Sequence, residues 1–121
     1  MKEATIERET KETKISISVK LDGNGQADIQ TGIGFFDHML TALSVHSGIS
    51  MQIHVQGDLH VDGHHTVEDT GIVLGKALGE ALGDKSGITR YGHAFIPMDE
   101  ALAFCSLDLS NRPFLVFQGT F

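Results

Sequence analysis

The sequence predicts an α+β fold that consists of one complete strand-and-helix unit and the opening of a second, similar unit. In residues 1–87, stretches with the two-residue period of a strand and the 3.6-residue period of a helix follow one another in the order βββαβα. The opening pattern then returns, because "ISISVKLDGNGQADIQT" and "LAFCSLDLSNRPFLVFQGT" both run from a strand through Asp and turn residues into another strand. We therefore expect one half-domain at 1–87 and the three opening strands of another at 88–121.

Four segments of the first unit are predicted strands. Residues 3–10 and 14–21 alternate polar with apolar or β-branched side chains, and "DGNG" at 22–25 is typical of a turn. "QADIQT" predicts a short third strand, and "ISMQIHVQGD" at 49–58 predicts a fourth, which alternates in the same way.

Two predicted helices complete this unit. The first runs from Gly34 to near Gly48, with apolar residues at helical spacing at Phe36, Met39, Leu40 and Leu43. The second runs from about His65 to Gly83, and its expected core face carries Val67, Leu74, Leu78 and Ala81. Gly71, Gly75 and Gly79 form a stripe in which each Gly costs about 1 kcal/mol relative to Ala, so we expect another backbone to pack closely there.

The last part of the chain predicts three more strands, "RYGHAFIPMD", "ALAFCSLDLSNRP" and "FLVFQGTF". No helix or strand that would complete this second unit follows, so we expect a shortened chain with an open, apolar edge. Cys105 lies alone in an apolar run and is expected to be buried and reduced.

Composition and charge exclude several classes of protein. Nine Lys and Arg residues stand against sixteen Asp and Glu residues, and the net charge of −7 argues against a nucleic-acid partner. No apolar run approaches the roughly 18 residues of a membrane span, and "MKEATIERET" lacks the apolar segment of a secretion signal. We expect a cytoplasmic protein without a membrane partner.

The start of the second helix, "VDGHHTVEDTGIVLG", places two histidines side by side. Neighbouring residues of a helix point about 100° apart, so His64 and His65 cannot share one ligand direction. His64 and Glu68, four residues apart, do share a face. Imidazole and carboxylate groups together suit divalent Mn, Fe, Zn, Co or Ni. The alternative is that these residues are only solvated or cap the helix start.

His38 adds a third candidate ligand. It lies off the core face of the first helix, and the neighbouring Asp37 is expected to orient an imidazole by accepting a hydrogen bond.

These motifs together resemble the imidazoleglycerol-phosphate dehydratase family. The similarity runs through "KETKISISVKLDG", "TGIGFFDHML", "GDLHVDGHHTVEDTGIVLGKALGEALGD", "ITRYG", "PMDEALA" and "DLSNRP" in this order. The resemblance implies duplicated βββαβα half-domains of the ribosomal protein S5 domain 2-like fold. It also implies a lyase of histidine biosynthesis, two Mn²⁺ ions per active site, and a homo-oligomer of 24 subunits with sites between chains.

The resemblance assigns the metal ligands in two pairs. His64 and Glu68 resemble ligands of one ion, and His38 and His65 resemble ligands of the other. The remaining ligands of the family come from a second His-His-x-x-Glu motif and a further histidine that this sequence lacks. We therefore expect this chain alone to bind metal weakly and to be inactive.

The implied reaction removes water from imidazole glycerol phosphate to give imidazole acetol phosphate. Glu12 resembles the family's acid–base glutamate, Arg90 and Arg112 resemble phosphate-binding arginines, and His46 resembles a substrate-pocket residue. The chain departs from the family at Ala42, where relatives often carry glutamine, and at Asn111, where glycine is usual. The other histidines, His54, His60 and His93, are interpreted as structural or exposed.

Two other functions remain open on the residues alone. One is a non-catalytic metal-binding or self-assembling module. The other is a metal-dependent hydrolase that uses a metal-bound water. Only the dehydratase requires Glu12, Arg90 and Arg112 to converge on one cleft.

Overall fold

A computed structural model describes residues 2–120 and confirms the α+β class. The chain divides into two compact units, Met1–Ser86 and Gly87–Phe121, and each is described by itself. None of the helices in the described residues is long and apolar enough to cross a membrane.

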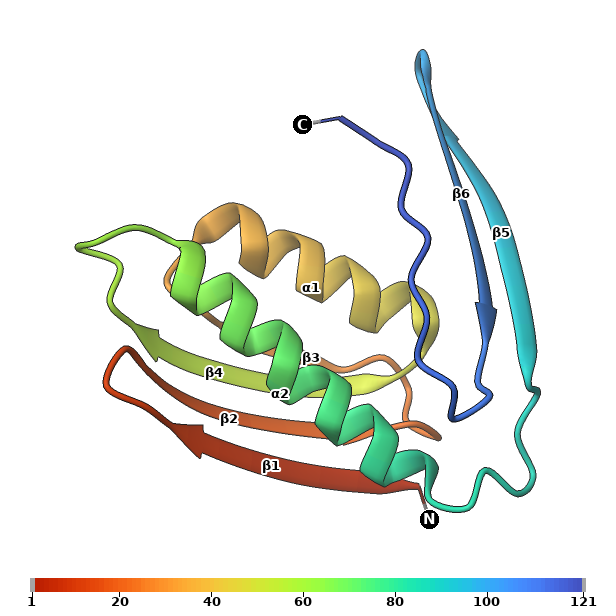
Figure 1. Cartoon of the computed structure of the whole chain (residues 1–121), viewed down its shortest axis with the longest axis horizontal. Helices are drawn as coiled ribbons and strands as arrows, with labels where there is room; N and C mark the ends of the chain where they lie inside the picture. Colours follow the sequence, from red (N-terminus) through yellow and green to blue (C-terminus); the bar gives the residue numbers. More distant parts are fainter. Residues whose placement is uncertain (1, 121) are drawn as a thin grey trace. The chain divides into compact units, whose positions relative to one another are not determined.

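The first unit is a four-stranded sheet with two helices on one face (Figure 1). Its strands are β1 (Glu3–Glu9), β2 (Thr13–Lys20), β3 (Ala27–Gln30) and β4 (Ser50–Gly57), in the spatial order β1-β2-β4-β3. β2 pairs antiparallel with β1 and β4, whereas β3 and β4 are parallel and are joined through helix α1 (Gly34–Ser47). Helix α2 (His64–Leu82) follows β4 and packs on β1 and β2.

The core lies between the sheet and the helices, as the alternating pattern predicts. Ile15, Ile17 and Val19 of β2 pair across the ladder with Val55, Ile53 and Met51 of β4, and all six side chains are buried. Because β2 and β4 occupy the centre of the sheet, their inward side chains are covered on every side. This central pair therefore fixes the register of the unit.

The predicted core face of α2 is confirmed for Ala81, and Leu74 and Leu78 pack against the core, but the other buried positions differ from the prediction. Val67 is 44% exposed, and Leu74 and Leu78 are only partly buried, whereas the fully covered positions are Thr66, Thr70, Val73, Ala77 and Ala81. Small side chains let the helix lie close to the sheet. The buried Thr70 hydroxyl is satisfied within the helix, because it donates a hydrogen bond to the Thr66 carbonyl at 2.6 Å. The prediction failed at these positions because it placed only apolar residues in the core, whereas two of the buried residues are threonines.

Helix α1 has the predicted bounds but a narrower buried face. It ends at Gly48, whose φ of 76° is left-handed, and only Leu40 and Ser44 are fully buried. Met39 and Leu43 are 48% and 45% exposed, so the prediction that they face the core was wrong. α1 packs mainly on β3 and β4, and β3 has four residues, so the sheet beneath this helix is too narrow to cover the whole stripe.

The glycine stripe of α2 faces open space. A Cβ atom built on Gly71, Gly75 or Gly79 would meet nothing within 4 Å among the described residues. The close-packed neighbour that the stripe predicts is therefore not provided by the described residues of the first unit.

The second unit is a hairpin of β5 (Tyr91–Met98) and β6 (Ala101–Asp108), paired antiparallel like β1 and β2. Phe95 and Phe104 stack across it with ring centroids 4.4 Å apart. Every residue of both strands is exposed, because no helix or second sheet layer of this unit covers them. The prediction of a buried Cys105 was therefore wrong, and its free thiol is exposed.

The third strand predicted for this unit, at 114–121, is not formed in its described residues 114–120. The first unit supplies the reason, because β3 there pairs only with β4 and makes no ladder with β1 or β2. A strand needs a partner for its backbone hydrogen bonds, and 114–120 finds none in the described part of its unit.

Candidate metal and substrate site

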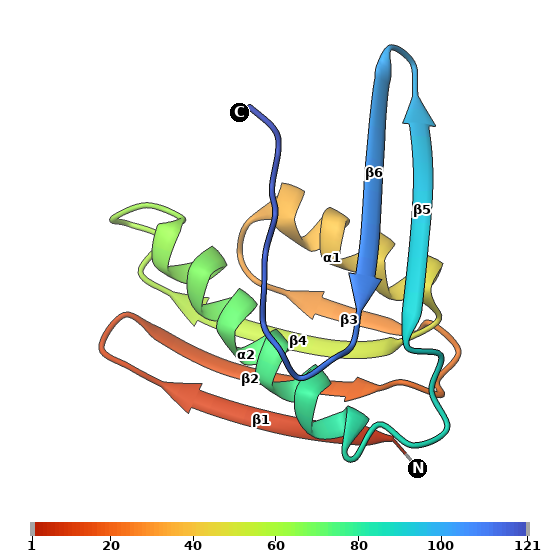
Figure 2. The same cartoon turned by 45° about the vertical axis from the view of Figure 1, so that its right-hand side comes forward.

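The candidate residues of the first unit gather at one end of it. Figures 1 and 2 show that both helices begin at the end where the β1–β2 turn lies and where β4 finishes. This end carries His38 in the first half of α1, His64, His65 and Glu68 in the first turns of α2, and Glu12 in the turn. Helix starts present free N–H groups and are favourable places for carboxylates.

A close approach of β4 to α2 brings these groups together. A Cβ atom on Gly57 would meet the Thr66 Oγ1 atom and lie 3.2 Å from the Thr66 Cβ, so only glycine fits without a shift. Gly57 also pairs with Thr13, the first residue of β2. The end of β4, the start of α2 and the Glu12 turn are therefore neighbours in space.

His64 and Glu68 form the first pair of candidate ligands. The His64 Nε2 and Glu68 Oε2 atoms lie 2.8 Å apart, and both side chains are more than half exposed. The backbone N–H of His64 donates to Asp62 Oδ1 at 2.8 Å, which anchors the helix start. The predicted shared face of these residues is thus confirmed, and their donor atoms point toward the same place.

His65 turns away from this pair and has its own carboxylate partner. Its Nδ1 atom lies 2.8 Å from Oδ2 of Asp58, the residue that follows β4. The two histidine rings have centroids 5.7 Å apart and are inclined by 68°. The divergence predicted from the helix geometry is therefore present in the rings themselves.

Carboxylates raise the pKa of His65. The largest cause is the hydrogen bond with Asp58, and the negative charges of Asp58, Glu12 and Asp62 act in the same direction, against a lowering by desolvation. The Glu12 charge acts on this ring, so the predicted acid–base residue and a predicted ligand lie within electrostatic reach of each other. The negative charges around His65 therefore favour a positive charge at this position.

The turn that carries Glu12 is held by Thr10. The Thr10 hydroxyl contacts Glu12 Oε2 at 3.2 Å and accepts hydrogen bonds from the backbone N–H groups of Glu12 and Thr13, at 3.2 and 3.1 Å. A threonine that closes a turn in this way limits the positions open to the next side chains. Glu12 itself is exposed at the surface.

Asp69 attaches this turn to helix α2. Its Oδ2 accepts a 2.6 Å hydrogen bond from the buried Thr13 hydroxyl, and its Oδ1 forms a 3.1 Å ion pair with Arg8 Nη1. The hydrogen bond from Thr13 and the charge of Arg8 lower the pKa of Asp69. Asp69 lies one helical turn after His65, so it links the Glu12 turn to the helix that bears three candidate ligands.

Asp37 does not orient a histidine as predicted. Its Oδ1 accepts hydrogen bonds from the backbone N–H of Thr31, at 2.9 Å, and from the Thr31 hydroxyl. Thr31 is buried, so Asp37 serves to close the loop before α1. His38 is exposed, as expected for a residue off the core face.

His46 lies away from the other candidates of the first unit. It is in the last turn of α1, eight residues after His38, which corresponds to about 12 Å along a helix axis. The structure therefore does not bring His46 to the end where the candidate ligands gather.

Arg90 pairs with a carboxylate in the second unit, and Arg112 lies within electrostatic reach of the same group. Arg90 Nε and Nη2 donate to Asp108 Oδ1 and Oδ2 at 2.6 and 3.3 Å, and its guanidinium carbon lies 5.0 Å from the Tyr91 ring centroid. The hydrogen bond from Arg90 lowers the pKa of Asp108, and the charges of Arg90 and Arg112 add to this effect. Both arginines therefore act on one place.

Asn111 explains how the chain tolerates the loss of the glycine usual before Arg112. Its φ is 64°, in the left-handed region where glycine is favoured and asparagine is among the better alternatives. The turn before Arg112 therefore has a backbone conformation that a glycine at position 111 would also adopt.

The imidazole nitrogens and the carboxylate oxygen of these candidate ligands are donors that suit a divalent transition-metal ion. His64 and Glu68 offer an imidazole nitrogen and a carboxylate oxygen 2.8 Å apart, and His65 offers a ring whose other nitrogen is already engaged. Within residues 2–120, no three His, Cys, Asp or Glu side chains are placed to hold one ion. Among the described residues, His64 and Glu68 are therefore a pair of candidate ligands and not a complete site.

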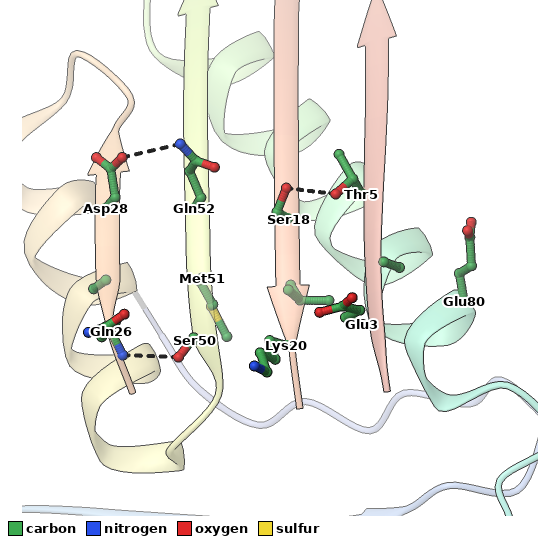
Figure 3. Close-up of a pocket in the computed structure, with 13 residues that line it drawn as sticks. Glu3, Thr5, Ser18, Lys20, Gln26, Asp28, Ser50, Met51, Gln52 and Glu80 are labelled. Atoms are coloured by element: carbon green, nitrogen blue, oxygen red, sulfur yellow. Dashed lines mark hydrogen bonds between the residues drawn. The ribbon is translucent and has the colours of Figure 1, made fainter. Parts of the chain in front are cut away.

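A hollow of the first unit lies elsewhere and is lined by none of the candidate residues. Figure 3 shows it on the outer face of the sheet, around the start of β1 and β4 and the end of β2. There, Asp28 accepts hydrogen bonds from Gln52 Nε2 at 3.3 Å and pairs with His54 Nε2 at 3.0 Å. The structural role expected for His54 is confirmed, and His60 and His93 are exposed.

Three functional neighbours were missed by the sequence analysis: Asp58, Asp69 and Asp108. Each is a carboxylate paired with a candidate residue or with the turn that carries one. Asp69 reaches Thr13 and Arg8 from a distant part of the chain. Asp58 and Asp108 reach their partners across a loop and across a hairpin, which spacing along the chain does not reveal.

Comparison with known proteins identifies the family. The model of the family "Imidazoleglycerol-phosphate dehydratase" matches residues 31–121. Proteins of that name from Streptococcus thermophilus and Mycolicibacterium smegmatis are 61% and 57% identical over 100% and 96% of this chain, which spans 62% and 56% of their lengths. A crystal structure of the Staphylococcus aureus dehydratase matches with a TM-score of 0.84 at 42% identity, covering 98% of this chain and 64% of that one. The chain belongs to the imidazoleglycerol-phosphate dehydratase family.

Proposed function

We propose that this chain supplies part of an active site that removes water from imidazole glycerol phosphate and yields imidazole acetol phosphate. The observation that carries the proposal is the gathering of two divergent histidines, Glu68 and Glu12 at one end of the first unit. The names of relatives that are about 60% identical support the same reaction. In this reaction one C–H bond and one C–OH bond break, and the resulting enol tautomerises to a ketone.

Two Mn²⁺ ions are proposed to bind, one at His64 and Glu68 and the other at His38 and His65. Bound cations would stabilise the negative charge that develops on the imidazole ring when the carbon loses its proton. The remaining ligands must come from residues that this chain does not supply. We expect the chain alone to bind Mn²⁺ weakly and to show no dehydration at micromolar concentration.

Glu12 is the proposed acid–base residue. The Thr10 hydroxyl holds one of its oxygens, and the Thr13–Asp69 hydrogen bond holds its turn against α2. A carboxylate in a fixed position can take the proton from carbon and pass a proton to the departing hydroxyl.

Arg90 and Arg112 are the proposed phosphate-binding residues. Asp108 occupies two N–H groups of Arg90, and a guanidinium has five, so the group can bind Asp108 and a phosphate together. His46, distant from the ligand end of its own helix, is proposed to serve a pocket that another copy completes.

A hybrid protein tests the proposal. Residues 1–121 would replace the matching part of the Streptococcus thermophilus relative, which aligns with all of this chain. We expect dehydration that depends on Mn²⁺, a loss of at least about 100-fold in Glu12→Gln, and little change in the control His54→Ala. Metal binding without dehydration would favour a non-catalytic module, and release of inorganic phosphate would favour a hydrolase.

A further inference from the structure

Asp58 contacts His65, a proposed metal ligand, and has no role in the proposed reaction itself. It is the first residue after β4 and begins the loop that leads to α2, where its carbonyl accepts the Val61 N–H at 2.9 Å. Its side chain is only 14% exposed. Gly57, which permits the close approach to Thr66, sets the backbone immediately before it.

The two oxygens of this carboxylate have different surroundings. Oδ2 lies 2.8 Å from His65 Nδ1, whereas Oδ1 is buried and has no hydrogen-bond donor within residues 2–120. A buried carboxylate that lacks other donors depends strongly on the one that it has. The Asp58 side chain is therefore committed to the His65 ring.

This contact decides which nitrogen of His65 carries the proton. A carboxylate accepts hydrogen bonds and cannot donate one, so the proton of the neutral ring must lie on Nδ1. The lone pair is then on Nε2, and the His65 side chain is 41% exposed, so this atom can be reached from solvent. His64 is arranged differently, because its Nε2 faces Glu68, the residue proposed to bind the same ion.

We propose that Asp58 is a positioning residue, which holds His65 as the Nδ1–H tautomer with Nε2 available to a divalent cation. The metal-binding part of this inference rests on the proposed function, whereas the tautomer can be measured without metal. Carboxylates that hold a ligand histidine in this way fix the orientation of the ring and raise its basicity.

Nitrogen-15 NMR of the histidine rings, at a pH where they are neutral and without metal, tests the tautomer. We expect Nδ1–H for His65 and, in the same spectrum, Nε2–H for His54, because Asp28 contacts the Nε2 atom of that ring. Asp58→Ala and Asp58→Asn should shift His65 toward Nε2–H, and the matched control Asp28→Ala should leave it unchanged. Far-UV circular dichroism would show that each variant is folded.

Mn²⁺ binding to the hybrid protein described above, followed by electron paramagnetic resonance, tests the consequence. We expect Asp58→Asn to weaken binding by about 10- to 100-fold and Asp28→Asn to have no effect. An unaltered chain with His65 as Nε2–H, or an Asp58 variant that keeps both the tautomer and the affinity, would overturn the proposal. The expected tautomer in a hybrid protein that takes up no Mn²⁺ would support Asp58 as the group that orients His65 and contradict the proposed function instead.

Discussion

The hydrogen bond between Thr13 and Asp69 gives a quantitative test of how the Glu12 turn is attached to helix α2. Thr13 is 3% exposed and the Asp69 side chain 14% exposed, so water cannot easily replace their 2.6 Å contact. Hydrogen bonds to charged groups contribute about 1.5–3 kcal/mol, whereas the ion pair with the 32% exposed Arg8 adds about 1 kcal/mol or less. We expect Asp69→Ala to lower the free energy of unfolding by about 2–3 kcal/mol and Thr13→Val by about 1.5–2 kcal/mol.

The two substitutions should not be additive, because each removes the same hydrogen bond. Urea unfolding followed by circular dichroism should give a coupling energy of about 1–2 kcal/mol between them. Asp28→Ala, which removes an exposed carboxylate from the outer face of the sheet, is the control and should change stability little. An Asp69→Ala variant within about 0.5 kcal/mol of the unaltered chain, or strictly additive effects, would refute the proposed attachment.

The same contact predicts a dependence on pH. The pKa of Asp69 is lowered in the folded chain, so its contribution is fully present above the pKa of the unfolded carboxyl and is lost as the pH falls through the lower, folded value. The difference in stability between the unaltered chain and Asp69→Asn should therefore be largest near neutral pH and shrink in acid. A difference that grew in acid would contradict this sign.

Three further outcomes are expected. Gly57→Ala should lower the free energy of unfolding by about 1–3 kcal/mol in urea titrations, because the added Cβ meets buried Thr66. Asn111→Ala should lower the stability of the second unit by about 1 kcal/mol and Asn111→Gly should not, as followed by the fluorescence of Tyr91, the single tyrosine of a chain without tryptophan. Light scattering should show association that increases with concentration, because the exposed β5–β6 hairpin has free edges, and a monomer at all concentrations would contradict this.

The sequence predicted the order of the strands and helices in the first unit, and their bounds to within one or two residues. Gly48 and Gly83 mark the ends of the helices, and both have positive φ values that explain why glycine stands there. The alternation of β2 and β4 also predicted which of their side chains are buried. These predictions succeeded because each depends on residues that are close in the sequence.

The failures have a common physical cause, since they concern contacts between distant segments. Thr66 and Thr70 are buried because the helix lies close to the sheet, which no apolar pattern indicates. Residues 114–120 alternate like a strand, yet a strand also needs a partner. Cys105 is apolar in its surroundings along the chain but belongs to a hairpin that nothing in its own unit covers.

At the candidate site, too, the prediction that depended on helix geometry succeeded, whereas contacts between separate segments were not predicted. The divergence of His64 and His65 followed from helix geometry alone and is present in the rings. The choice of Asp37 as an orienting carboxylate was wrong, because neighbours in the sequence do not have to meet in space. Asp58 contacts His65 from seven residues away, across the loop that joins β4 and α2.

The central claim is that the adjacent histidines serve two different ions, and metal positions in two variants test it most directly. Crystals of the hybrid protein with His64→Ala or His65→Ala, each soaked in Mn²⁺, would be compared by anomalous scattering with crystals of the unsubstituted hybrid, which supplies the remaining ligands. We expect His64→Ala to lose the ion beside Glu68 and keep the one at His65, and His65→Ala to show the reverse. If both variants emptied the same position and kept the other, or if the unsubstituted hybrid held one ion shared by both rings, the claim would be contradicted.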